Sequence, residues 1–136
     1  MKKFLALEFV PRSADLALLV LRVWLGVAMG WLHGWGKLLA LFGGRNPFDQ
    51  AILGLPPAVA FPLTTFAEVG CAALLIVGLW TRLAAFVLVV TMAVAFFVAH
   101  GAKLSGPGSG ELAFLYLAGY FAVLVAGAGR FSVDGK

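Results

Sequence analysis

The chain has 136 residues, of which 62% are hydrophobic and only 12% are charged, and its mean hydropathy is +1.03. Soluble domains are about half apolar and roughly a quarter charged, so this composition excludes a water-soluble globule and a disordered chain and predicts an integral membrane protein. The net charge of +4 does not indicate nucleic-acid binding, because the ten lysines and arginines are spread among apolar runs and form no phosphate-binding patch.

Four apolar stretches are each long enough to cross about 30 Å of hydrocarbon, which takes roughly 20 helical residues. They cover residues 15–42, 58–80, 83–100 and 111–128. A short segment at 49–54 is expected to lie along the membrane interface, Thr81–Arg82 to form a tight turn, and 101–110 to form a Gly/Pro/Ser loop. Membrane β-strands are not expected, since the runs lack a period of two and are too long. The predicted fold is an all-α integral membrane four-helix bundle, with residues 1–136 in one domain.

The distribution of basic residues predicts the orientation of the bundle. The first span is expected to stay uncleaved, because Glu8, Pro11 and Asp15 interrupt the early apolar run and the span is too long for a signal peptide. With four spans, both termini lie on one side. That side holds Lys2, Lys3, Arg12, Arg82, Arg130 and Lys136, whereas the opposite loops hold Lys37, Arg45 and Lys103. The positive-inside rule therefore predicts that both termini are cytoplasmic.

Ionisable residues inside the predicted spans are the functional candidates, because a charge near mid-bilayer costs about 2.5–3.5 kcal/mol. On the first span the strongly polar residues and two glycines share an arc of roughly 80°. This stripe consists of Arg22, Gly26, Gly30, His33 and Lys37. It is predicted to face protein and not lipid, and its glycines would admit a close neighbour, either within the chain or in a second copy.

Counting depth at about 1.5 Å per helical residue predicts two polar layers separated by an apolar middle. The outer layer would hold His33, Lys37, Glu68, His100 and Glu111. Glu111 at a helix start also has a structural explanation, since the helix dipole favours a carboxylate there. The cytoplasmic layer would hold Arg22, Arg82, Arg130 and Asp134.

The arginines of the cytoplasmic layer are expected to snorkel to the interface and to meet anionic lipid or one another. Asp134 would then fold the tail back as a clasp on Arg22 or Arg82. A binding site for an anionic ligand is the alternative for this cluster.

Several segments of the chain resemble the DoxX family of small bacterial membrane proteins. The matching segments are LRVWLGVAMGWLHGWGKL at 21–38, EVGCAALLIVGLWTRLAA at 68–85, His100, GSGELAFLYLAGY at 108–120 and GAGRFSVDG at 127–135. The resemblance implies a four-helix fold in the bacterial inner membrane and an association with sulfur or thiol oxidation. Members of that family include subunits of quinone-linked thiosulfate oxidoreductases and of complexes that respond to oxidative and thiol stress.

The outer layer is accordingly predicted to be the catalytic pocket of a membrane redox subunit that passes reducing equivalents to quinone. Glu68 or His33 would exchange the proton and Lys37 would stabilise a developing anion, with His100 and Glu111 at the pocket mouth. An aromatic slot for the quinone ring would be formed by Trp31, Trp35, Phe66 and Phe96. The structural alternative is that Glu68 only neutralises Lys37 while His33 hydrogen-bonds within the bundle.

Other cofactors fit the sequence less well than quinone. His33 and His100 could ligate haem, or a metal together with Glu68 or Glu111, but the histidines lack a short spacing and the bundle is rich in small residues. No metal site is therefore expected. The single cysteine, Cys71, excludes an internal disulfide and a Cys-based zinc site. It is interpreted as a small buried hydrophobe, with a thiol relay as the alternative.

Two other classes of function compete with a redox role. The chain could be a non-catalytic anchor or assembly subunit, whose polar layers serve packing and docking of a partner protein. It could also be a small transporter or lipid-handling protein, since polar groups inside a bundle can mark a solute path. A transporter of this length would need to form a homo-oligomer. In each case the expected surroundings are the lipid bilayer and other subunits, and not nucleic acid.

Overall fold

The structure is a computed structural model that describes residues 2–136, and the regular elements in this part of the chain are all helices. A short helix α1 (Lys2–Leu5) precedes the bundle. The first long helix consists of α2 (Ala14–Ala28), η1 (Met29–Gly34) and α3 (Trp35–Phe42). The second consists of α4 (Pro57–Phe66), η2 (Ala67–Cys71) and α5 (Ala72–Val77). The third consists of α6 (Thr81–Val94) and η3 (Ala95–Ala99), and α7 (Glu111–Ala126) is the fourth.

Three of these helices are long and apolar enough to cross a membrane, namely those at Ala14–Phe42, Pro57–Val77 and Thr81–Ala99. The fourth, Glu111–Ala126, is a shorter apolar helix of 16 residues. Large apolar side chains also cover the outside of the bundle, as expected where helices face lipid tails. The prediction of an all-α integral membrane four-helix bundle is thus confirmed, and the side of the membrane that holds the termini stays a prediction.

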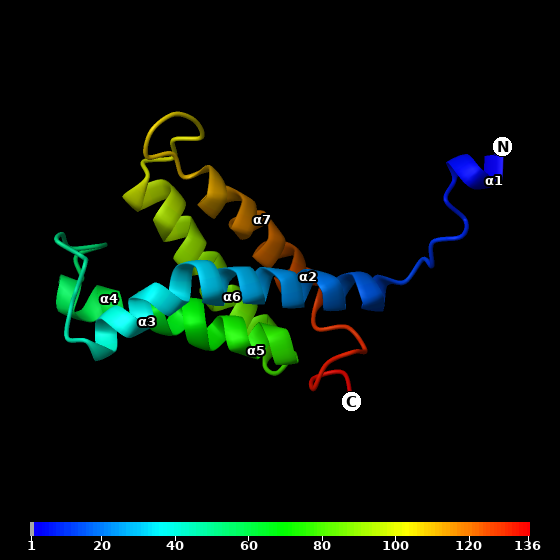
Figure 1. Cartoon of the computed structure of the whole chain (residues 1–136), viewed down its shortest axis with the longest axis horizontal. Helices are drawn as coiled ribbons and strands as arrows, with labels where there is room; N and C mark the ends of the chain where they lie inside the picture. Colours follow the sequence, from blue (N-terminus) through cyan, green and yellow to red (C-terminus); the bar gives the residue numbers. More distant parts are fainter. Residues whose placement is uncertain (1) are drawn as a thin grey trace.

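The four helices are arranged as two antiparallel pairs. The long helix α2–α3 lies beside α4–α5, while α6 and α7 form a hairpin that packs on this pair and diverges from it at an angle (Figure 1). We call the end of the bundle where α2 begins, α5 meets α6 and α7 stops the tail end, since the C-terminal residues fold there. The other end, with the connections at 43–56 and 100–110, is the loop end. Those two connections lie well apart, because the hairpin diverges towards the loop end (Figure 1).

The three longest helices each contain a π-helical segment: η1, η2 and η3. A π turn inserts an extra residue into the helix, and such segments occur frequently at functional sites. The extra residue also rotates the side chains that follow it. Positions predicted from the sequence at 100° per residue are therefore wrong in depth and direction beyond each π-helical segment.

Glycines of the predicted stripe allow the first two long helices to approach closely. A methyl group on Gly26 would lie 2.6 Å from Ile76 Cγ1 and 2.8 Å from the Ala72 carbonyl oxygen. Gly30 also faces Ala72, at an ordinary contact distance of 3.8 Å. The neighbour that these glycines admit is therefore α5 of the same chain.

The connection between the second and third helices differs from the predicted turn. Helix α5 stops at Val77 and α6 begins at Thr81, so the turn occupies residues 78–80, and Thr81 and Arg82 already belong to α6. Gly78 has φ +73 and ends α5 in the left-handed conformation that favours glycine. The predicted interfacial segment 49–54 is non-helical and leads into a tight turn closed by an antiparallel bridge between Ile52 and Leu55.

Candidate functional site

An ion pair joins the first two long helices near the loop end. The Lys37 ammonium on α3 lies 2.6 Å from Oε1 and 2.5 Å from Oε2 of Glu68 on η2. The Glu68 side chain is only 6% exposed and that of Lys37 is 27% exposed, so the carboxylate is buried and the ammonium is partly accessible. Among the residues whose side chains the structure describes, 4–136, this is the one ion pair.

The pair depends on the close approach of the two backbones beside it. Gly34 packs against the residues around Glu68, and a methyl group there would lie 3.0 Å from the Glu68 carbonyl oxygen and 2.6 Å from Val69 Cγ2. Any larger residue at Gly34 would therefore push η1 away from η2. Because Lys37 follows Gly34 by about one turn, this glycine sets the distance that the lysine spans.

His33 faces the fourth helix. Its ring meets Tyr116 edge-on, with 5.7 Å between centroids and an interplanar angle of 87°. Tyr116 stacks on Tyr120 at 5.8 Å, and the Tyr120 hydroxyl donates a hydrogen bond of 3.4 Å to the Leu25 carbonyl. Both tyrosines are buried and His33 is half-buried, so a row of three polar rings leads from His33 into the interior.

The tyrosines were not among the residues predicted from the sequence. A signal was present, because the chain has only two tyrosines and they stand four residues apart, which puts them on one face of a helix.

The predicted ionisable residues are associated with the π-helical segments. His33 lies in η1, Glu68 lies in η2 and His100 directly follows η3. Cys71 is also in η2, where it is buried in the apolar core.

His100 and Glu111 lie at the far end of the α6–α7 hairpin. The His100 Nδ1 atom is 2.7 Å from the Ala95 carbonyl oxygen, and Glu111 is exposed at the start of α7. No hydrogen bond or ion pair of the described residues links either of them to Lys37 or Glu68. The structure therefore brings two of the five outer-layer residues into direct contact. Equal depth along diverging helices does not produce proximity, and Figure 1 shows how far the hairpin loop departs from α3 and α4.

The four predicted slot residues do not form a single aromatic slot. Trp31 and Trp35 stack on each other at 6.0 Å and are both exposed. Phe96 is buried against Phe97 and Phe114, and Phe66 is exposed. The tryptophans thus form a small outward-facing platform, while Phe96 belongs to the core.

Arg22 is fully buried at the tail end and does not snorkel to the interface, contrary to the prediction. Its guanidinium donates hydrogen bonds of 2.8 Å to the Leu75 carbonyl, 3.5 Å to that of Ile76 and 2.6 Å to that of Phe131. The first two acceptors are carbonyls at the end of α5, where the helix dipole favours a cation. An arginine snorkels when its own helix offers it no partner inside the membrane. Here carbonyl groups of two other segments bind the Arg22 guanidinium, so it stays inside the bundle.

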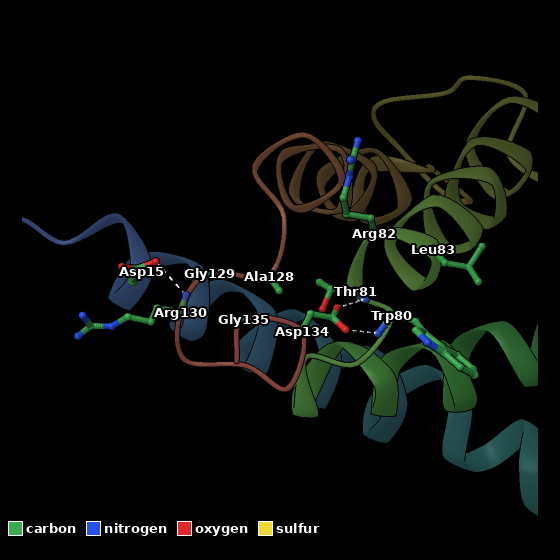
Figure 2. Close-up of a pocket in the computed structure, with 10 residues that line it drawn as sticks. All are labelled: Asp15, Trp80, Thr81, Arg82, Leu83, Ala128, Gly129, Arg130, Asp134 and Gly135. Atoms are coloured by element: carbon green, nitrogen blue, oxygen red, sulfur yellow. Dashed lines mark hydrogen bonds between the residues drawn. The ribbon is translucent and has the colours of Figure 1, made fainter.

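The tail folds back, as predicted, but the Asp134 carboxylate binds backbone amides instead of an arginine. Its Oδ1 accepts from Trp80 N at 2.8 Å and its Oδ2 from Thr81 N at 2.7 Å, so it caps the start of α6 (Figure 2). The Thr81 amide holds the pKa of this exposed carboxyl below its ordinary value of 3.8. Arg82 Nε donates to the Leu124 carbonyl at 3.1 Å, near the end of α7.

Asp15 completes this arrangement in the first turn of α2, where its Oδ1 accepts from the backbone N–H of Arg130 at 2.9 Å. The tail end is therefore held by charged side chains that bind helix termini and tail backbone. Among the residues that the structure describes, no group of three His, Cys, Asp or Glu side chains is placed to hold a metal ion.

These features define a multi-pass helical membrane protein with charged residues buried in its bundle. The family model described as DoxX matches residues 17–101, and the chain belongs to the DoxX family. A protein of Haemophilus influenzae, described only as an uncharacterized protein, is 36% identical over 116 residues, which are 77% of this chain and 79% of that protein. No solved structure matches the chain. The matched residues include Lys37, Glu68 and both histidines, whereas α7 and the tail follow them.

Proposed function

We propose that this DoxX protein is the membrane subunit of a redox system, in which Lys37, Glu68 and His33 handle protons while reducing equivalents pass to a quinone. The observation that carries the proposal is an ion pair between two membrane helices whose carboxylate is buried, with Glu68 and His33 in π-helical segments. Charges inside a membrane protein are costly and commonly functional, and π segments are frequent at functional sites.

The ion pair has the donor that a quinone carbonyl needs. An ammonium has three N–H groups, and the two Glu68 oxygens leave at least one of them free. Because the Lys37 side chain is 27% exposed, an acceptor at the bundle surface can reach it.

A bound quinone would supply the electron acceptor, so that oxidation of two thiols of a sulfur donor to a disulfide would be balanced by transfer of two electrons and two protons to it. In this scheme the Glu68 carboxylate accepts a proton released by the donor, and the His33 imidazole relays protons. The Lys37 ammonium stabilises negative charge that develops on the carbonyl oxygen.

The orientation that follows from the basic residues belongs to the same proposal. Their excess at the tail end supports a cytoplasmic location for that end in the bacterial inner membrane, with the Lys37–Glu68 pair towards the outer face.

The proposal is tested by measuring quinone content and donor-dependent quinone reduction with purified protein in nanodiscs, using a dithiol and thiosulfate as donors. Glu68→Gln and His33→Ala should each lower turnover by roughly 100-fold or more, the range of a lost general acid or base. Asp49→Asn is the matched control, because it makes the same acid-to-amide change at an exposed position of the loop end. Unchanged quinone content and turnover in both variants would remove the proposal. Loss of partner assembly alone would instead support the anchor function.

A further inference from the structure

The tail end contains an open pocket of about 760 Å³ that the proposed redox chemistry does not use. It lies between the start of α2, the turn before α6 and the segment that follows α7 (Figure 2). Its lining is mostly apolar, with Trp80, Leu83 and Ala128, and its cationic groups are Arg82 and Arg130. An apolar hollow with two guanidinium groups suits a ligand that is both anionic and apolar.

Both arginines keep donors available for such a ligand. Arg82 uses its Nε–H for the Leu124 carbonyl, and its two terminal nitrogens make no hydrogen bond to any residue that the structure describes. The Arg130 guanidinium lies 5.3 Å from the ring of Phe131 and is exposed. Figure 2 shows the two side chains on different sides of the pocket, pointing away from each other and not towards the two carboxylates.

The carboxylates of the pocket are bound to backbone. Asp134 accepts from two amides at the start of α6, and Asp15 accepts from the backbone N–H of Arg130. Neither acid forms an ion pair with Arg82 or Arg130, so both guanidinium groups are free to bind an external anion.

The position of the pocket along the bundle corresponds to the level of lipid headgroups. One helix begins and another ends beside it, at Thr81 and Ala126. Trp80 is 64% exposed and Leu83 is 60% exposed, and tryptophan is enriched where a membrane meets water. The apolar part of the pocket is therefore accessible from the bilayer and its cationic part from the headgroup layer.

We propose that this pocket binds one anionic phospholipid, with its phosphate between Arg82 and Arg130 and an acyl chain along Leu83 and Trp80. Basic pockets between membrane helices bind anionic headgroups in this way. Binding in this way requires the two arginine side chains to turn towards the phosphate from the directions that Figure 2 shows. The phosphate is the recognised group, and the apolar lining selects a lipid over a free phosphate ion.

Native mass spectrometry of the full chain in mild detergent, with phosphatidylglycerol and phosphatidylcholine added in equal amounts, tests the proposal. Wild type should retain one phosphatidylglycerol preferentially. Each of Arg82→Gln and Arg130→Gln should lower the preference about fivefold, and the double variant on the order of 25-fold. Arg82→Lys and Arg130→Lys, which keep the charge, should retain most of it.

Arg12→Gln is the matched control, because Arg12 is exposed at the same end but does not line the pocket. An equal loss of preference in Arg12→Gln, or a double variant that binds phosphatidylglycerol like wild type, would overturn the site. If glycerol phosphate displaced the lipid at a similar concentration, the claim that the pocket selects a lipid would be refuted, and the pocket would be a site for small anions. Circular dichroism of each variant establishes that the helices are intact.

Discussion

Replacing Lys37 by methionine leaves the Glu68 carboxylate without its cation, at a position where only 6% of the glutamate side chain is exposed. Removing one partner of a buried ion pair costs about 3–5 kcal/mol, because the remaining charge is desolvated and unpaired. The partial exposure of Lys37 lets water or headgroups reach the site, so we expect the lower end, about 3 kcal/mol. Glu68→Leu should lower the free energy of unfolding by a similar or smaller amount, because it leaves the Lys37 ammonium unpaired but that ammonium is less buried than the carboxylate.

The double variant Lys37→Met/Glu68→Leu distinguishes the loss of the ion pair from the loss of side-chain packing as the cause of a lower free energy of unfolding. Replacing both charges by apolar side chains of similar size is often neutral, so the double variant should lie within about 1 kcal/mol of wild type. The coupling energy of the cycle should therefore be several kcal/mol. If the pair only holds helices together, this variant will keep the activity of wild type; if it serves chemistry, the variant will be folded and inactive.

The free energy of unfolding can be measured by titration with sodium dodecyl sulfate in mixed micelles, followed by circular dichroism. Thr91→Val is the control, because the Thr91 hydroxyl bonds only the Val87 carbonyl of its own helix. We expect it to change stability by less than about 1 kcal/mol. Single variants of Lys37 and Glu68 that both unfold within about 0.5 kcal/mol of wild type would refute the reasoning, since the buried carboxylate would then not need its cation.

Two further predictions concern the tail end. Gly78→Ala should destabilise the protein by more than 2 kcal/mol in the same titration, because φ is +73 and the new methyl group would collide with Arg22, whereas Gly36→Ala, with nothing within 4 Å, should be neutral or stabilising. The Thr81 amide lowers the pKa of Asp134 in the folded protein. The stability that the Asp134 carboxylate contributes is therefore complete above the ordinary pKa of 3.8 and is lost as pH falls through the pKa of the folded state. Resistance of the tail to an acid-active carboxypeptidase, assayed at each pH, should follow this dependence in wild type and lose it in Asp134→Asn; equal pH dependence in both would contradict the cap.

The fold class could be predicted because membrane helices are encoded locally, as apolar runs of sufficient length. The number of residues from the end of each helix predicted that Lys37 and Glu68 lie at the same depth. They are in contact because their two helices lie side by side. The same counting could not show that His100 is remote, since the angle of the α6–α7 hairpin depends on packing. The burial of Arg22 was missed for a related reason, because its acceptors come from segments far along the chain.

The hydrogen bonds of Arg22 have a consequence for how this protein is made. Its acceptors Leu75 and Phe131 follow it by 53 and 109 residues, and translation delivers them in that order. The first membrane segment thus enters the bilayer with a cation that stays incompletely paired until the segment containing Phe131 leaves the ribosome. Membrane insertion of the first helix and formation of the Arg22–Phe131 hydrogen bond are therefore separate events. A C-terminal fusion that displaces Phe131 would prevent the hydrogen bond but not the insertion.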